Sequence, residues 1–446
     1  MKKYIQFHYV KLVSLLFLPV ILIVFISMDL FTPQWNSGIS ILKKVRAGNT
    51  VSYSKNNNGY LYIVSGRDEN DAILKTVQRY DVNNNFWDTL NPHPTGLLGA
   101  ATAVLKDSLY LIGGVVNPPG SGQVTVYKFS ISQNVWTTVA NCPAALADAK
   151  AVSYQDSLIY TAGGIGGPNG GNVYVYNSNS DSWRTATSFP SSGRRNFGGF
   201  AISGDTLVYM CGTTAFGSAS YFDSVYVGVI SQNDRSVINW TRGANFPGQT
   251  RTFFDACSWG SNGIIMTGGS TDNTFNTPSN ECYSFSPGRN QWTRLPDKPT
   301  PWLTGQSGSV KLNNNIWKLI CASGYSSGYL SQTEILTDTL NTVGITNISS
   351  HNPGNYFLSQ NYPNPFNPAT KINYELGVTN YVSIIVYDVL GNEIESLVNQ
   401  KQNAGRYEVE FDGSNLTSGV YFYKLVTGSL RGAKDYSAVK RMVLIK

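Results

Sequence analysis

Histidine is almost missing from this sequence, and its scarcity excludes several kinds of catalytic site. Only three of the 446 residues are histidines, namely His8, His93 and His351. Copper oxidase sites of one common kind need two imidazole ligands, and a Ser-His-Asp triad needs a histidine partnered with a nucleophile motif. The sequence therefore predicts no metal centre, no cofactor site and no serine-type hydrolase.

Cysteine is also sparse. The five cysteines are an odd number and show no CxxC or CxH spacing: Cys142, Cys211, Cys257, Cys282 and Cys321. A cysteine metal cluster is excluded by that spacing, and buried, small apolar side chains are the simpler interpretation. A disulfide stays open for a chain that reaches an oxidising compartment.

Charge is low for a soluble chain. Asp, Glu, Lys and Arg make up 13% of the residues, against about 25% in typical soluble domains. The net charge of +6 is spread over the chain without a basic stripe, so we expect no nucleic-acid partner.

The single long apolar run lies at the N-terminus. Residues 12–26 are apolar apart from one serine and follow Lys2, Lys3 and Lys11. This pattern predicts a signal peptide over residues 1–30, although Phe25, Ile26 and Ser27 make a poor cleavage site and retention as an anchor stays open. Contact with a membrane is expected only through this segment or through surface anchoring.

One unit of about fifty residues then repeats six times. Each copy has a polar turn, a short apolar run, a small-residue pair that ends in glycine and, about twenty residues later, a tryptophan. The glycines are Gly66, Gly114, Gly164, Gly212, Gly269 and Gly324, and the tryptophans are Trp87, Trp136, Trp183, Trp240 and Trp292. The turns, such as Asn58-Gly59 and Asp107-Ser108, are hairpin signals between β-rich runs.

This period and landmark set resembles the kelch repeat, whose unit is a four-stranded propeller blade. The resemblance implies an all-β fold with a six-bladed β-propeller over residues 33–346. The sixth unit has no tryptophan in its last strand, but Trp35 lies at the right distance before Gly66. We therefore expect the strand around Trp35 to complete the last blade and close the ring.

The remaining residues break the period. A polar linker is expected over residues 347–355, followed over residues 356–446 by short strands with turns between them, which indicates a small immunoglobulin-like β-sandwich. Its ordered motifs resemble the C-terminal sorting domain of type IX secretion substrates. They contain Asn361, Pro363, Asn364, Pro365, Phe366, Asn367, Pro368, Gly405, Tyr407, Gly419, Tyr421, Lys440 and Lys446. The resemblance implies that the type IX machinery is a partner and that the protein passes through the periplasm to the outer cell surface or the medium.

A ligand site is expected on the propeller face that carries the variable loops after the second strands and the loops after the fourth strands. Aromatic rings there suit stacking on sugars, and arginines suit an anionic group, although the same arginines would serve equally well to pin blades together. The candidate residues are Arg194, Arg195, Arg251, Trp302, Tyr221, Phe275 and Tyr325.

Three functions are compatible with these features. The first is a binding or adhesion module for a glycan or a protein ligand. The second is a metal-free carbohydrate enzyme similar to the kelch epimerase that interconverts sialic acid anomers (a mutarotase), with Asp148 and Asp255 as acid and base. The third is a structural envelope protein whose propeller is an assembly surface.

Overall fold

The computed structural model describes most of the chain from residue 33 onward. The described ranges are 33–116, 120–165, 171–191, 195–215, 220–260, 263–312, 316–338, 346–349, 354–413, 416–428 and 436–446. The expected signal peptide (1–30) and Arg194 lie outside them. Every regular element within these ranges is a β-strand.

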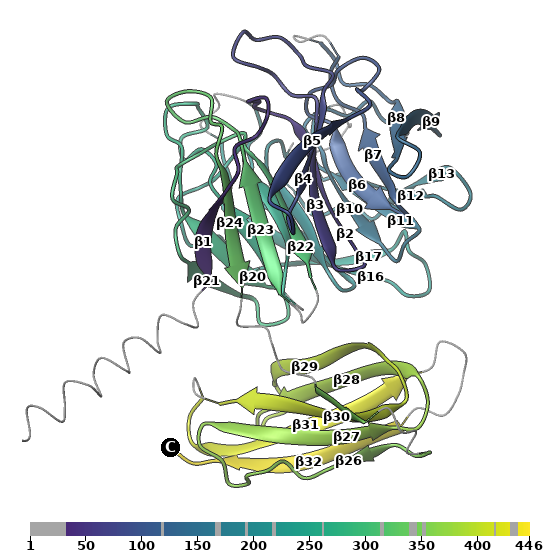
Figure 1. The fold of residues 1–446 in the computed structure, drawn as a ribbon, viewed down its shortest axis with the longest axis vertical. Helices are drawn as coiled ribbons and strands as arrows, with labels where there is room; N and C mark the ends of the chain where they lie inside the picture. Colours follow the sequence, from purple (N-terminus) through teal and green to yellow (C-terminus); the bar gives the residue numbers. More distant parts are fainter. Residues whose placement is uncertain are drawn as a thin grey trace, which may run out of the picture.

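Six four-stranded antiparallel sheets form the blades of a propeller, which confirms the six-bladed fold (Figure 1). Blade one contains β2 (Asn49–Lys55), β3 (Asn58–Val64), β4 (Val77–Asp81) and β5 (Phe86–Leu90). Blade two contains β6 (Ala101–Leu105), β7 (Ser108–Ile112), β8 (Val126–Ser130) and β9 (Val135–Val139). Blade three contains β10 (Lys150–Tyr154), β11 (Leu158–Ala162), β12 (Val173–Asn177) and β13 (Ser182–Ala186).

The next blades repeat this order. Blade four contains β14 (Gly199–Ser203), β15 (Thr206–Met210), β16 (Val225–Ile230) and β17 (Ile238–Arg242). Blade five contains β18 (Asp255–Trp259), β19 (Gly263–Thr267), β20 (Cys282–Ser286) and β21 (Gln291–Leu295). Blade six contains β22 (Gln306–Lys311), β23 (Trp317–Ala322) and β24 (Thr333–Asp338), and its outer strand is β1 (Gln34–Gly38).

The two ends of the propeller therefore meet in one sheet. Trp35 of β1 lies opposite Leu336 of β24, and five residue pairs make up the antiparallel register. Figure 1 shows purple β1 beside green β24. Because this pairing covers the outer edge of β24, the ring is held by strand hydrogen bonds between segments about 300 residues apart.

Local sequence explains the tight hairpins between first and second strands. Asn56 and Asn57 join β2 to β3, and Lys106 and Asp107 join β6 to β7, all with positive φ. Two successive left-handed residues give the turn that matches the twist of a hairpin. The second strands that follow are the most buried, as in β7 and β11, where every residue is buried.

The repeated tryptophans connect neighbouring blades. Each indole N–H donates to a backbone carbonyl just after the outer strand of the preceding blade, at 2.8 to 3.2 Å. The pairs are Trp35 with Pro296, Trp87 with Ile39, Trp136 with Asn91, Trp183 with Ala140, Trp240 with Thr187 and Trp292 with Ala244. Trp35 thus makes the same contact at the closure as the five tryptophans within the repeats.

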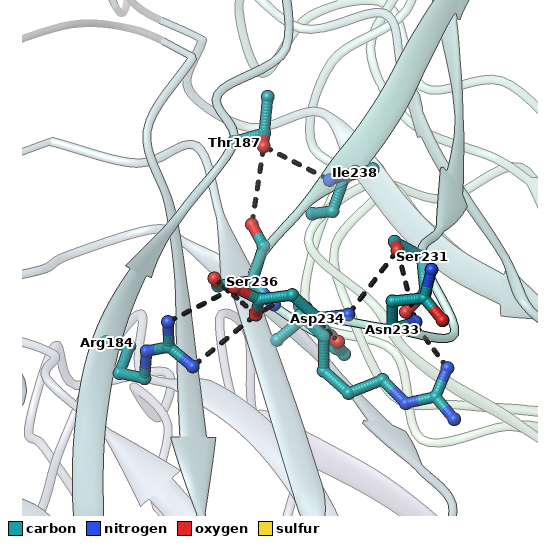
Figure 2. Close-up of polar contacts among 9 residues, drawn as sticks. Arg184, Thr187, Ser231, Asn233, Asp234, Ser236 and Ile238 are labelled. Carbon is teal, nitrogen blue, oxygen red and sulfur yellow. Dashed lines mark hydrogen bonds and ion pairs between the residues drawn. The ribbon is translucent and has the colours of Figure 1, made fainter.

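A second inter-blade contact comes from the turns between third and fourth strands. Asn134 and Asp181 accept, through side-chain oxygens, the backbone N–H of Asn91 and Ala140. Blade four departs from this pattern because its loop between β16 and β17 is longer. There Thr187 N donates to Ser236 O at 2.8 Å and Thr187 Oγ1 accepts from Ile238 N, while Arg184 approaches Asp234 (Figure 2).

The C-terminal domain is a sandwich of two four-stranded sheets. One sheet has the order β25 (Thr346–Ser349), β30 (Gly405–Asp412), β27 (Ala369–Leu376) and β26 (Phe357–Leu358). The other has the order β29 (Glu393–Gln402), β28 (Asn380–Tyr387), β31 (Gly419–Gly428) and β32 (Tyr436–Leu444). Alternating residues from the two sheets form a single apolar core, which is typical of an immunoglobulin-like sandwich.

The start of this domain differs from the predicted linker at 347–355. Residues 346–349 form β25, which pairs with β30 at the edge of the first sheet. The segment reads Thr-Asn-Ile-Ser, and an edge strand made mostly of polar residues gives little hydrophobic signal in the sequence.

Residues of the sorting motifs form hydrogen bonds within this sandwich. Asn361 is buried, and its amide donates to Thr370 Oγ1 and Pro363 O. Asn364 Oδ1 accepts Val443 N at 2.9 Å, and Phe366 exchanges backbone hydrogen bonds with Val443 and Ile445. The Asn-Pro segment therefore holds the last strand, β32, in place.

The later motif residues make local contacts. Tyr407 and Tyr421 each donate from the phenol to the carbonyl four residues earlier, at 2.8 Å, as in a tyrosine corner. Gly405 and Gly419 begin β30 and β31. Lys446 is exposed at the end of the chain, and Lys440 is half-buried on β32.

Candidate functional site

A cavity of about 900 Å³ runs along the propeller axis. The six first strands line it mostly with small or polar residues, among them Thr50, Thr102, Ser153, Ser258 and Ser309, while blade four contributes Phe200, Ala201 and Ile202. Small side chains on the innermost strands leave the axis open, because larger ones would meet there. The cavity opens on the face predicted to carry the site.

Six equivalent residues, each two positions before a first strand, surround this opening, and we call them the mouth ring. They are Ala47, Gly99, Asp148, Phe197, Phe253 and Thr304, all with φ between 47° and 61°. Four backbone hydrogen bonds join neighbours in the ring, including Phe253 N to Phe197 O at 3.1 Å and Thr304 N to Phe253 O at 3.0 Å. Left-handed backbone is unfavourable for residues with a Cβ, so these bonds help to fix a costly conformation at the opening.

Aromatic side chains form an arc over one half of the mouth, from blade four to blade six. Phe197 and Phe253 have ring centroids 4.3 Å apart, and Phe253 stacks on Phe275 at 5.6 Å. Phe275 then meets Tyr325 edge to face at 5.9 Å, and Tyr325 meets Tyr329 at 5.8 Å. Phe275 and Tyr325 are half-buried, so the arc offers a partly exposed apolar wall.

Two arginines continue the arc in blade one. Arg46 and Arg67 both line the cavity, and their backbones pair with each other. The Arg46 guanidinium lies 5.0 Å from the Phe275 ring centroid, and its Nε donates to the Tyr329 hydroxyl at 2.8 Å. Both guanidiniums contact Asp71 Oδ1 at 3.2 Å.

Two carboxylates line the channel, Asp148 before blade three and Asp255 at the start of blade five. Lys150 Nζ pairs with Asp255 Oδ1 at 2.6 Å, and Asp255 Oδ2 accepts Ser307 N at 3.2 Å. Asp148, in the mouth ring, accepts no side-chain hydrogen bond from the described residues. Burial raises the pKa of Asp148 to about 6, and the positive charge of Lys150 partly offsets this rise.

The structure brings two of the predicted site residues to the mouth. Phe275 lines the cavity, and Tyr325 contacts it. Tyr221 belongs to the loop between β15 and β16 and pairs with Thr213 through the backbone, but it does not line the cavity.

Arg195, Arg251 and Trp302 are corrections to the prediction, because they are 2%, 0% and 2% exposed. Arg195 donates to Ser191 and Ser224 and stacks on Phe222 at 3.3 Å. Arg251 donates to Glu281 Oε2 at 2.5 Å and to Gly268 O. These side chains are buried beside the strands that they contact and are not exposed at the mouth.

The repeat itself contains the signal that separates the two groups. Arg195, Arg251 and Trp302 stand four positions before a first strand, where the other blades have Val45, Leu97 and Leu146, all buried. At five of these six positions the backbone carbonyl accepts the N–H of a glycine in the preceding blade, as Leu146 does from Gly114, whereas Leu97 O accepts from the Asn49 amide. The mouth ring, which includes Phe197 and Phe253, stands two positions further along the chain. The sequence prediction missed these two phenylalanines, and it also missed Arg46 and Arg67.

A second recess of about 590 Å³ lies between blades three and four. It is lined largely by polar residues, including Asn177, Arg184, Asp234 and Arg235. The long β16–β17 loop forms one wall, and its contacts with blade three are those drawn in Figure 2.

Within the described ranges, no cluster of three His, Cys, Asp or Glu side chains is arranged to hold a metal ion. A search of the same residues for a helix of membrane-spanning length and hydropathy finds none.

Comparisons with known proteins agree with both domains. A kelch motif model matches residues 97–143, which contain blade two. A model for the secretion system C-terminal sorting domain matches residues 360–436.

Curated relatives match short segments. Human Kelch-like protein 15 is 33% identical over 67 residues, covering 15% of this chain and 11% of the relative. Alpha-scruin of Limulus polyphemus is 31% identical over 84 residues, covering 19% of this chain and 9% of the relative. The match thus spans about a tenth of the length of these relatives.

Among solved structures, YjhT aligns with a TM-score of 0.54 and 16% identity, over 70% of this chain and 97% of that one. This similarity concerns the fold alone. Together the matches identify a kelch-repeat propeller followed by a type IX sorting domain, so the chain is an exported kelch module.

Proposed function

We propose that this exported propeller binds a glycan in the mouth of its central channel and acts as a binding or adhesion module at the outer cell surface or in the medium. The observation that carries the proposal is the arc of Phe197, Phe253, Phe275 and Tyr325 beside charged groups around a 900 Å³ cavity. Sugar rings stack their C–H faces on aromatic rings and direct their hydroxyls to charged or polar neighbours.

The shape of the site supports a small glycan. A recess of this volume is within the range of small-molecule sites, and the mouth offers both hydrogen-bond donors, from Arg46 and Arg67, and an acceptor, from Asp148. Rigid walls also limit the entropy that is lost on binding, since the mouth ring is held by backbone hydrogen bonds.

A glycan array followed by calorimetry with the full exported chain tests this proposal. Phe253→Ala and Phe275→Ala should each weaken binding of a captured sugar by about tenfold, because each removes a stacking face. Tyr221→Ala is the matched control, since it removes an aromatic from a neighbouring loop that does not line the cavity. An array without any saturable sugar signal would favour a protein ligand or a structural role in the envelope.

A second candidate is a metal-free carbohydrate enzyme, for example one that interconverts sugar anomers. The favouring observation is Asp148, whose pKa of about 6 suits proton transfer near neutral pH. Anomer exchange requires one group to take the proton of the anomeric hydroxyl and another to protonate the ring oxygen, and Asp148 and Asp255 both line the channel. Exchange NMR on a bound reducing sugar would show faster anomer interconversion, which Asp148→Asn should abolish.

A further inference from the structure

We infer that Asp71 is a built-in counter-ion at the channel mouth, and that it competes with the carboxylate of an acidic sugar for Arg46 and Arg67. The inference rests on the proposed glycan site and deepens it by naming the chemical class of the ligand. Its basis is one carboxylate oxygen shared between two guanidiniums that line the cavity.

Ring contacts, a hydrogen bond and backbone pairing fix the positions of the two arginines. Arg46 is fixed by the Tyr329 hydroxyl and lies over the rings of Phe275 and Tyr329. Arg67 is paired through its backbone with Arg46 on one side and with Ile73 on the other. The side chains of Arg46 and Arg67 are only 22% and 24% exposed, so neither moves away from the mouth without losing packing.

Asp71 is different, because its side chain is 66% exposed and it does not line the cavity. Its loop is shaped by Asp68, which accepts the backbone N–H of Asn70 and of Ala72 through Oδ1. This turn presents Asp71, with a φ of 61°, to the two guanidiniums. The hydrogen bond and charge of Arg67, followed by those of Arg46, lower the pKa of Asp71, so the carboxylate stays ionised.

An anion is needed at this place even without a ligand. Two guanidiniums that share one acceptor repel each other, and Asp71 neutralises one of the two charges. Each guanidinium uses one N–H toward Asp71 and keeps further donors for a second, cavity-side acceptor. A carboxylate on a sugar stacked against Phe275 would meet these donors in bidentate geometry. Because the Asp71 pairs are exposed, displacing or weakening them costs little.

The experiment compares Asp71→Asn with Glu69→Gln in the full chain. Glu69 is the matched control because it lies in the same loop with a side chain 61% exposed and carries the same charge, but pairs with Lys44. The probes are the methyl glycosides of glucuronic and galacturonic acid, each measured by calorimetry against its neutral parent sugar.

We expect Asp71→Asn to tighten binding of the uronic acids about two- to fivefold and to leave the neutral sugars unchanged. Glu69→Gln should leave both unchanged, Arg67→Met should weaken the acidic probes, and the gain in Asp71→Asn should shrink in 0.5 M salt. The inference is overturned if Asp71→Asn has no effect, or if Glu69→Gln gives the same gain, because the effect would then be general charge. If neither neutral nor acidic sugars bind any variant, the proposed function itself has failed.

Discussion

The residue two positions before each first strand lies at the channel, whereas the residue four positions before it is buried. At the position four residues before a first strand, arginine is as buried as valine. Arg195 and Arg251 occupy the places of Val45 and Leu97, and buried polar atoms accept hydrogen bonds from each guanidinium, although Arg251 Nε has no partner among the described residues. Residue type alone is therefore a poor guide to function here, and position within the repeat is a better one.

Asp148 should make the protein less stable as the pH rises. The folded state keeps its proton up to about pH 6, whereas an unfolded aspartate releases it near pH 4. The folded state therefore binds more protons in this window, and stability falls as the pH rises through it. At pH 7.5 we expect Asp148→Asn to raise the free energy of unfolding by on the order of 1 to 3 kcal/mol, and the gain to disappear below pH 4.

Urea unfolding at pH 3.5, 5 and 7.5 measures this effect. Asp234→Asn is the control of opposite sign, since hydrogen bonds from Ser236 lower the pKa of Asp234. That variant should lose stability at pH 7.5 and match the parent only at acid pH. A gain for Asp148→Asn that is equal at all three pH values would contradict the assigned cause.

The indole contacts give a second prediction for single residues. Trp183→Phe removes the hydrogen bond to Ala140 O and should lower the free energy of unfolding by about 1 kcal/mol beyond the loss of indole area. Trp317→Phe, at the other end of the channel, is the control, because its indole donates no hydrogen bond among the described residues. Equal losses for the two variants would show that the repeated contact contributes nothing.

At the scale of elements, the closing role of β1 can be tested by deleting this strand. Deleting residues 33–38 removes β1 and uncovers the edge of β24 along five residue pairs. We expect a lower melting temperature and self-association in gel filtration, since a bare edge recruits other strands.

A peptide with the sequence of residues 33–38, added in excess, should raise the melting temperature of the shortened chain again, because it binds the folded state at the vacant edge. A peptide with alanine in place of Trp35 should fail to do so, since it lacks the contact to Pro296. Full stability of the shortened chain without any peptide would refute a closing role for β1.

The last strand gives the prediction for the sorting motif. Met442 and Leu444 of β32 are buried in the sandwich core, so truncating residues 440–446 would remove core packing together with any signal. Replacing both Lys440 and Arg441 by alanine separates these effects, because Arg441 is exposed and Lys440 half-buried. We expect this variant to melt normally and to be retained in the periplasm of a host with a type IX system, and normal appearance outside the cell would contradict a role for the basic flank.

The sequence predicts the strands well because each repeat needs a glycine where no Cβ fits and a tryptophan whose indole donates to the preceding blade. A Cβ on Gly164 would lie 2.6 Å from Ala147 O at a φ of +85°, so the residue pair after the second strand must end in glycine there. The mouth was harder to predict, since its members range from glycine to phenylalanine and share only a backbone conformation. Their side chains leave no common pattern in the sequence.

For the whole molecule, the propeller and the sandwich have separate cores. Residues 358–444 supply the buried cluster of the sandwich, and the blades supply the others. We expect a chain that stops before Thr346 to keep the melting transition of the propeller and to be trapped in the periplasm. Cell fractionation and calorimetry test this, and a fusion of residues 346–446 to an unrelated periplasmic protein should restore export. A collapsed melt would show that the two domains fold as one unit.

The mouth ring has a consequence for how such a protein changes over generations. Its hydrogen bonds run from backbone to backbone, so glycine, alanine, threonine, aspartate and phenylalanine all occupy equivalent places without breaking it. A single codon change at one of these six places therefore alters the side chain at the opening and leaves the backbone bonds of the ring intact. Duplicated genes of this kind can diverge in the chemistry of the opening while they inherit one scaffold and one export route.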